Sequence, residues 1–114
     1  MTNHANTVET EQCAGHVLVR LGGEVDLSWS QDVRRAVLAA LQGGLPVGVD
    51  LAAVDYIDSS GIAALVEGLQ GARSRGVAFA LIAVSAQVRA VLELARLDRV
   101  FTLAATTDEA FAGP

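Results

Sequence analysis

The chain has 114 residues, 52% of them hydrophobic, and a formal net charge of −5. This length suits one domain with a sizeable core and leaves little for a second. No apolar run approaches the roughly 20 residues that a membrane-spanning helix needs. The first six residues lack the basic region and the apolar core of a secretory signal. We therefore expect a cytoplasmic protein that binds no membrane.

Charge and cysteine content exclude further classes of function. All eight basic residues are arginine and form no basic cluster, whereas binding to nucleic acid needs several grouped cations. The single cysteine, Cys13, cannot form an intramolecular disulfide. His4 and His16 lie without the spacing of a structural zinc site. We therefore expect no nucleic-acid partner and no metal.

The N-terminal part of the chain predicts a hairpin. We expect residues 1–6 to be a disordered tail and residues 7–114 to form the single domain. A short edge strand is predicted over residues 8–11. A second strand is predicted over residues 16–21, where apolar side chains alternate with others as on a half-buried strand. Gly22-Gly23 is expected to end it.

A helix is expected after this hairpin. Ser28 and Gln31 have the spacing of a capping box, in which two side chains satisfy the backbone N–H groups of the first turn. Gly43-Gly44 is expected to stop the helix. Trp29 is interpreted as half-buried packing at the helix start, with a partner anchor as the alternative. The apolar stripe of this helix consists of Val33, Val37, Ala40 and Leu41.

The rest of the chain alternates strands with helices. The expected elements are a buried strand over 46–51, a helix from Ser60 to Arg75 with Gly76 as left-handed cap, a central strand over 77–84, a helix capped by Ser85, a strand over 100–103, and a terminal helix opened by a capping box from Thr106 to Glu109. Such alternation implies parallel strands joined by right-handed crossovers. We therefore expect an α/β fold with a small, mostly parallel mixed sheet. It has an N-terminal antiparallel hairpin and about four helices mainly on one face.

The stretch Asp58-Ser59-Ser60-Gly61 lies where the Ser60–Arg75 helix begins. Aspartate is a strong N-cap because its carboxylate accepts hydrogen bonds from otherwise unpaired backbone N–H groups. The two serines then lie in the first turn, next to the positive end of the helix dipole. Hydroxyls and accessible amides at such a place suit an anion or a phosphoryl group. A well-capped turn without a function explains the same residues.

We expect this protein not to be an enzyme. A serine nucleophile needs a base, and the two histidines lie far from the serine pair in sequence. The chain has neither a Gly-x-Ser-x-Gly elbow nor a glycine-rich nucleotide loop. Paired carboxylates can perform acid–base chemistry, but caps and solvated loops explain those near the motif equally well. These carboxylates are Glu24, Asp26, Asp55 and Asp58.

An ordered set of motifs resembles the STAS family of bacterial anti-sigma factor antagonists. Asp58-Ser59-Ser60-Gly61, between Ile57 and Ile62, is similar to the family signature. Gly23-Glu24-Val25-Asp26 resembles its Gly-Glu-x-Asp segment, and Asp50-Leu51 and Gly76 fall at matching places. The resemblance spans residues 16–110. The family often has glycine where this chain has Asp98, which leaves the end of the third helix undetermined.

The resemblance implies a regulatory phosphoprotein with a STAS-like fold. In the family, the first serine after the aspartate accepts phosphate, and here that residue is Ser59. The implied partner is an anti-sigma factor with a histidine-kinase-like ATPase fold that acts as a serine kinase. The unmodified antagonist binds it and frees the sigma factor, and the phosphorylated form releases it. The resemblance assigns partner contacts to Asp26, Asp58, Ser60, Gly61 and Ile62.

The resemblance also implies how the switch is reset and what this chain does not bind. A metal-dependent serine phosphatase would remove the phosphate. ATP would be bound by the kinase, so we expect no cofactor in this chain. The alternative is a non-phosphorylated STAS scaffold, in a membrane transport ATPase system or a stressosome-type assembly. The intact pair of serines favours the switch, because a scaffold needs no acceptor hydroxyl.

Overall fold

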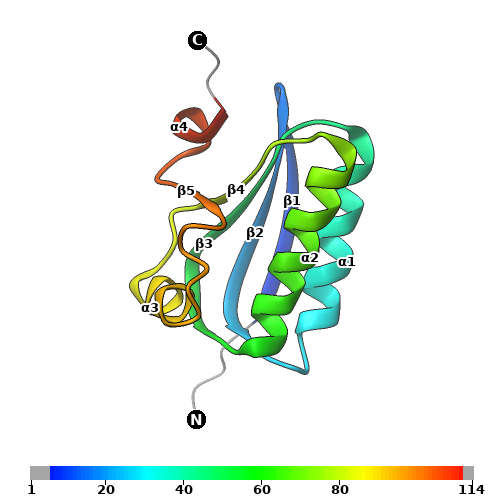
Figure 1. Cartoon of the computed structure of the whole chain (residues 1–114). Coiled ribbons are helices and arrows are strands. Elements are labelled where there is room, and N and C mark those ends of the chain that lie inside the picture. The colour runs from blue at the N-terminus through cyan, green and yellow to red at the C-terminus, as the bar shows by residue number, and fades with distance from the viewer. Residues whose placement is uncertain (1–5, 112–114) are drawn as a thin grey trace.

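The computed structural model describes residues 6–111 as one five-stranded sheet with packed helices (Figure 1). The strands are β1 (Thr7–Cys13), β2 (His16–Val25), β3 (Val47–Ile57), β4 (Phe79–Ile82) and β5 (Thr102–Ala104). The helices are α1 (Ser30–Ala40), followed by the short 3-10 helix η1 (Leu41–Gly43), α2 (Ser59–Arg75), α3 (Ala86–Leu94) and α4 (Thr107–Phe111).

The strands lie in the sheet in the order in which they occur in the chain, β1-β2-β3-β4-β5. β1 pairs antiparallel with β2, and every other neighbouring pair is parallel. The parallel strands are joined through helices, as such connections require. The predicted mixed sheet with an N-terminal hairpin is therefore confirmed.

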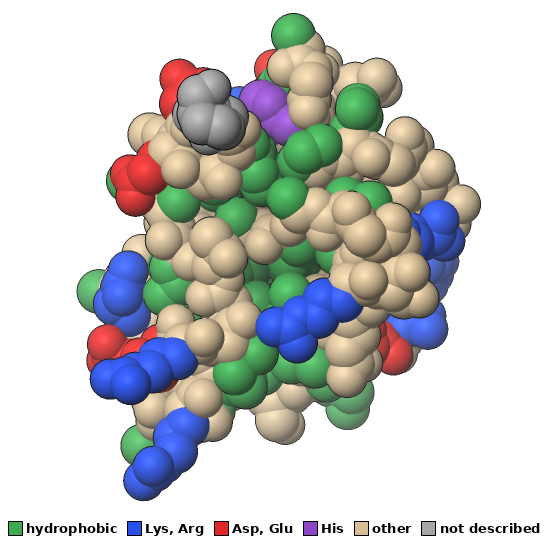
Figure 2. Space-filling model, turned by 45° about the horizontal axis from the view of Figure 1, so that its top comes forward, with side chains coloured by type: hydrophobic (Ala, Val, Ile, Leu, Met, Phe, Trp, Pro, Cys, Tyr) green, Lys and Arg blue, Asp and Glu red, His purple; other side chains and the backbone are tan. Residues whose placement is uncertain are grey.

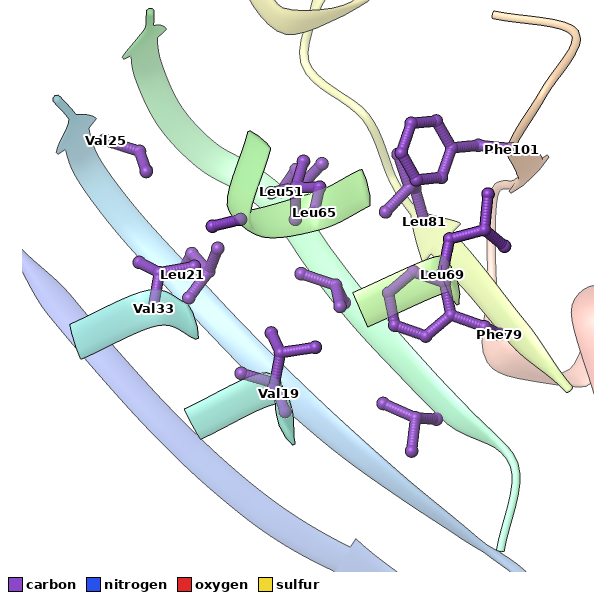
Figure 3. Close-up of a cluster of buried hydrophobic side chains, with 14 of the residues drawn as sticks. Val19, Leu21, Val25, Val33, Leu51, Leu65, Leu69, Phe79, Leu81 and Phe101 are labelled. Carbon is purple, nitrogen blue, oxygen red and sulfur yellow. The ribbon is translucent and has the colours of Figure 1, made fainter. Parts of the chain in front are cut away.

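One continuous hydrophobic core lies between the sheet and helices α1, α2 and α3. Figure 3 shows Val19 and Leu21 of β2 facing Val33 of α1, with Leu65 of α2 nearby. Val33 is fully buried, as the apolar stripe of its helix predicts. Burial of this kind contributes about 25 cal/mol for each Å² of apolar surface removed from water. The three long helices thus share one face of the sheet, as expected.

The opposite face of the sheet has a second, smaller hydrophobic cluster. Leu18, Ala80 and Ile82 are buried there, with Phe111 of α4 packed against them. The ring of Phe111 also lies 5.8 Å from that of His16, between centroids. His16 is half-buried beside this ring. The short terminal helix therefore covers the face that the other helices leave open.

Charged side chains are dispersed over the outside of the molecule. Figure 2 shows arginine side chains at several separate places on one face, with hydrophobic side chains between them. That face therefore carries no single basic patch. Among residues 6–111, ion pairs between Arg20 and Glu11 and between Arg34 and Glu67 join separate elements. Such exposed pairs contribute at most about 1 kcal/mol each.

Strands β2 and β3 are longer than their sequences suggest. Gly22-Gly23 does not end β2, which continues to Val25 with shifts of register beside the two glycines. Gly23 has φ +88°, a left-handed conformation that glycine adopts without strain. β3 continues through Ile57, because residues 53–57 pair with the extended part of β2. This long-range pairing carries both strands to the start of α2.

The start of α1 also differs from its prediction. The helix begins at Ser30 after Trp29, and no side chain caps it. The predicted Ser28–Gln31 capping box is wrong, because the Ser28 hydroxyl donates instead to Asp26. Trp29 is half-buried and packs against the core, as interpreted from the sequence.

The ends of the chain and the later strands show smaller differences. Residues 1–5 of the predicted disordered tail lie outside the described part of the chain. Asn6 is described, and its side-chain oxygen accepts a hydrogen bond from the Glu24 amide at 2.9 Å. β4 and β5 are shorter than predicted or displaced by a residue or two. The helix caps at Ser85 and Thr106 are confirmed by their bonds to backbone amides.

Helices α1 and α2 approach closely because α2 carries a glycine at their contact. A Cβ atom at Gly68 would lie 2.6 Å from the Val37 side chain and 3.0 Å from the Phe79 ring. Neither distance is compatible with a side chain at this position. Glycine inside a helix costs about 1 kcal/mol relative to alanine, and close packing of the two helices offsets that cost here.

The end of α3 places a non-glycine residue in the left-handed conformation. Arg96 has φ +61°. Its amide bonds to the Glu93 carbonyl and the Leu97 amide to the Leu92 carbonyl, which is the Schellman arrangement of a helix end. The left-handed position at this helix end, where glycine is the commonest residue, is thus Arg96, two residues before Asp98.

We predict that Arg96→Gly stabilises the protein by about 1 kcal/mol, because glycine removes the cost of the left-handed backbone at this position. Urea unfolding followed by circular dichroism measures the change. Arg89→Gly, within α3, is the matched control and should destabilise by about 1 kcal/mol. A loss of stability in Arg96→Gly would contradict the assignment of the helix end.

Candidate functional site

The two family-like motifs meet at one end of the sheet. Val25 and Ile57 are paired at the ends of β2 and β3. The residues that follow them, Asp26 and Asp58, therefore leave neighbouring strands at the same end of the sheet. The Asp58 amide donates to the Val25 carbonyl at 3.2 Å. In Figure 1 this place lies at the lower end of the sheet, where α2 begins.

The carboxylate of Asp58 organises the first turn of α2. Its Oδ1 atom accepts hydrogen bonds from the Ser60 amide at 2.9 Å and from the Gly61 amide at 3.2 Å. The same oxygen accepts a third bond, from the Ser60 hydroxyl at 2.6 Å. The backbone of Asp58 is extended, as an N-cap residue requires. The predicted cap is therefore confirmed.

This network keeps Asp58 ionised. The hydrogen bond from the Ser60 hydroxyl lowers the pKa of the Asp58 carboxyl below its ordinary value. Desolvation by burial opposes this shift in pKa, and the amides of Gly61, Ser60 and Leu27 add to it. The site thus holds a negative charge next to the positive end of the α2 dipole.

Asp26 makes a second network of the same form on the neighbouring strand end. Its Oδ1 atom accepts from the Ser28 amide at 3.0 Å and from the Ser28 hydroxyl at 2.6 Å. Its backbone carbonyl accepts from the amides of Trp29 and Ser30, which lead into α1. Both strands therefore leave the sheet through a turn in which an aspartate binds the serine two residues on.

The two serines at the start of α2 are not equivalent. The Ser60 side chain is half-buried and its hydroxyl donates to Asp58. Ser59 is exposed, and its hydroxyl makes no hydrogen bond with the residues that the structure describes. Of the two hydroxyls, that of Ser59 is open to a reagent from solution. In the sequence, only the resemblance to the family distinguishes them, because it assigns the phosphate to the first serine after the aspartate.

Two of the predicted contact residues serve to pack the helix. Gly61 and Ile62 are buried. A Cβ atom at Gly61 would lie 2.6 Å from the Ile57 side chain and 2.7 Å from the Val25 carbonyl oxygen. Only glycine fits there. The surface of this site is formed by Ser59, with half-buried Asp26, Asp58 and Ser60 beside it.

An exposed apolar residue that the sequence reasoning missed flanks this surface. Leu27 is 74% exposed. A shallow hollow of about 200 Å³ between α1 and α2 is lined by Leu27, Ser60 and Ala63, among others. A leucine directly after Asp26, in a turn with no apolar stripe to join, is the sequence signal that could have found this surface.

Metal-binding clusters and membrane-spanning helices are both absent from the described part of the chain. Residues 6–111 contain no group of three or more histidine, cysteine, aspartate or glutamate side chains arranged to hold a metal ion. Among the same residues, every helix is too short or too polar to cross a lipid bilayer.

Comparison with known proteins gives a consistent result. The sequence profile of the STAS domain matches residues 6–110. A Mycobacterium tuberculosis protein with a proposed anti-anti-sigma role is 30% identical over 113 residues, which cover 92% of this chain and 76% of that protein. A crystal structure from Thermotoga maritima, described as that of a proposed anti-sigma factor antagonist, superposes with a TM-score of 0.81. It is 26% identical and 90% of each chain is covered.

The fold also matches that of SpoIIAA, an anti-sigma factor antagonist solved in two states. The unphosphorylated form superposes with a TM-score of 0.76, covering 91% of this chain and 92% of the other. The phosphorylated form, from Bacillus, gives a TM-score of 0.68 with 93% and 96% covered. At 22% identity this likeness concerns the fold alone.

We predict that Gly61→Ala destabilises the protein by about 1–3 kcal/mol, because the added methyl group overlaps Ile57 and the Val25 carbonyl. Chemical denaturation measures the free energy of unfolding. Gly43→Ala is the matched control, since a Cβ atom there meets nothing within 4 Å. Equal effects of the two substitutions would show that the start of α2 is not closely packed on the strand ends.

We predict that Asp58→Asn destabilises the protein by about 0.3–1 kcal/mol at pH 7, because asparagine keeps an acceptor for the cap but loses the charge at the helix terminus. The folded-state pKa of Asp58 is lowered, so its charge stabilises the fold above the unfolded-state pKa of about 4. That contribution is lost as pH falls through the lowered pKa. Urea unfolding at pH 7 and at pH 2 measures the difference, and a difference independent of pH would contradict this role.

Proposed function

This chain belongs to the STAS domain family, and we propose that it is a cytoplasmic anti-sigma factor antagonist that phosphorylation of Ser59 switches off. The observation that supports this most directly is the difference between the two serines. Asp58 engages the Ser60 hydroxyl, whereas that of Ser59 is exposed and unbonded among the described residues. A kinase that approaches the start of α2 from solution meets Ser59 first.

The proposed partner is an anti-sigma factor with a histidine-kinase-like ATPase fold, which acts as the serine kinase and supplies the ATP. The unmodified chain binds this protein and so frees the sigma factor. A metal-dependent serine phosphatase restores the unmodified form. The anti-sigma relationships of the relatives above support this choice of partner.

The surface around Ser59 has the composition of a protein contact. Exposed Leu27 supplies apolar area, and Asp26 and Asp58 flank it with acidic groups. Interfaces commonly combine an apolar centre with a polar rim. We assign Gly61 and Ile62 an indirect part, since both are buried and hold the helix start in place.

Phosphorylation acts on this contact and not on the fold. A phosphoserine carries about −1.5 to −2 charges near neutral pH. At a helix N-terminus such a charge is favourable by about 0.3–1 kcal/mol, so the domain stays folded. In a closed interface the same charge must be desolvated beside Asp26 and Asp58. A penalty of about 3–4 kcal/mol there lowers affinity by two to three decades.

A non-phosphorylated scaffold, in a transport ATPase system or a stressosome-type assembly, is the second candidate. It shares the fold and makes no use of the free hydroxyl. The two functions differ in whether residue 59 controls binding.

We predict that Ser59→Ala retains an anti-sigma factor kinase from lysate of the host organism, and that Ser59→Glu does not, because the carboxylate imitates part of the phosphate charge. Affinity capture with each variant as bait, followed by mass spectrometry, identifies the retained proteins. With purified kinase and ATP, Ser60→Ala should still gain one phosphate and Ser59→Ala none.

Three results would count against this function. Phosphorylation of Ser59→Ala to the wild-type extent would place the acceptor elsewhere. Capture of a transporter ATPase by both baits would support the scaffold, and elution far above monomer size on gel filtration would support a stressosome-type assembly. Urea unfolding of each variant checks that the Asp58 cap tolerates the substitutions.

A further inference from the structure

The outer edge of the sheet is open along β1. Within residues 6–111, this strand of seven residues pairs with β2 alone. Five of its residues are exposed, and only Val8 and Cys13 are half-buried. An ordered edge strand presents unpaired backbone N–H and C=O groups, to which another extended chain can bind.

A groove runs beside this edge, between β1 and α1. It has a volume of about 420 Å³ and is lined mainly by small or apolar residues, including Thr10, Gln12, Ala36, Ala39, Gly43 and Leu45. The alanines of α1 leave space that larger side chains would fill. Thr10 pairs with the buried Val19 across the hairpin, so it lies on the helix side of the sheet. A strand added to β1 would therefore direct alternate side chains into this groove.

The other face of the same edge is acidic. Asp50, Arg20 and Glu9 are directly paired across β3, β2 and β1, so charges alternate along this row. Glu11, on the same face, bonds to Arg20. The row thus ends on a carboxylate at the open edge. Oppositely charged residues that face each other across strands stabilise a sheet, and like charges destabilise it, so the next strand should carry basic residues here.

A second copy of this chain does not satisfy that requirement. In such a dimer, β1 of one copy would pair antiparallel with β1 of the other around a twofold axis perpendicular to the sheet. The acidic faces of the two sheets would then lie on the same side. The carboxylates of Glu9 and Glu11 on one chain then lie opposite those of the other, or next to them. The acidic face therefore opposes pairing of β1 with a second copy of this chain. It favours pairing of β1 with a strand that carries basic residues.

We propose that β1 and the groove beside α1 bind an extended segment of a partner protein, which joins the sheet as an additional strand. Its alternating residues are basic, opposite Glu9 and Glu11, and small and apolar, in the groove. Backbone hydrogen bonds supply affinity and the two faces supply specificity, as in other complexes formed by strand addition. The groove is lined by Gly43 and Val17, where α1 ends and β2 begins. It therefore lies at the opposite end of β2 from Ser59, and both sites can be occupied together.

The test uses the full chain and a fluorescent heptapeptide of alternating arginine and valine, Arg-Val-Arg-Val-Arg-Val-Arg. Saturable binding is expected by fluorescence anisotropy. NMR spectra should show slowed amide exchange in β1 and shifts in α1, with no change at the start of α2. Ala39→Trp fills the groove and Glu9→Gln removes the charge at the edge. We expect each to weaken binding at least fivefold.

Matched controls lie on other elements. Ala90→Trp, an exposed alanine on α3, and Glu109→Gln, an exposed glutamate on α4, should leave affinity unchanged. A peptide with glutamate in place of every arginine, and one with proline in place of the central valine, should not bind. Absence of saturable binding, equal binding of the acidic peptide, or unchanged affinity in both Ala39→Trp and Glu9→Gln would overturn the proposal. Dimerisation through β1 in sedimentation equilibrium would overturn it as well.

Discussion

The start of α2 depends on one oxygen atom of Asp58. That atom accepts hydrogen bonds from two backbone amides and from the Ser60 hydroxyl. A single carboxylate therefore caps the helix, orders its first turn and binds the hydroxyl of one of two neighbouring serines. Ser59, by contrast, is exposed and makes no side-chain hydrogen bond within residues 6–111. The two neighbouring hydroxyls thus differ in exposure and in bonding before any partner is bound.

The cap has this effect only because the two strand ends lie side by side. β2 would stop short of Asp26 if the chain ended its pairing at Gly22-Gly23. Instead the glycines absorb two shifts of register and the strand continues to Val25, beside Ile57. Gly61 then lets α2 pack directly onto both strand ends. Three glycine positions, none of which carries a functional group, therefore set the relative positions of the acidic and hydroxyl groups.

Local patterns were sufficient to predict the elements whose causes are local. The cap of α2, its glycine end at Gly76 and the buried stripe of α1 all follow from residues within a few positions of one another. The end of β3 could not be predicted in this way, because residues 53–57 are extended by pairing with residues 22–25, which lie far from them in sequence. The capping box at Ser28 is wrong for a different reason, since the Ser28 hydroxyl donates to Asp26 and does not cap the helix. The burial of Ile62 likewise depends on tertiary packing.

The strands lie in the sheet in chain order, and this has a consequence for synthesis on the ribosome. Each new strand pairs with the one made just before it, so every closure spans a short stretch of chain and costs little entropy. The sheet can grow in one direction as the polypeptide emerges. Leu18 and Ile82 are the exception, because Phe111, which covers them, is made after all five strands. During translation this apolar face is exposed to water until α4 has emerged, and until then it can bind chaperones or cause aggregation.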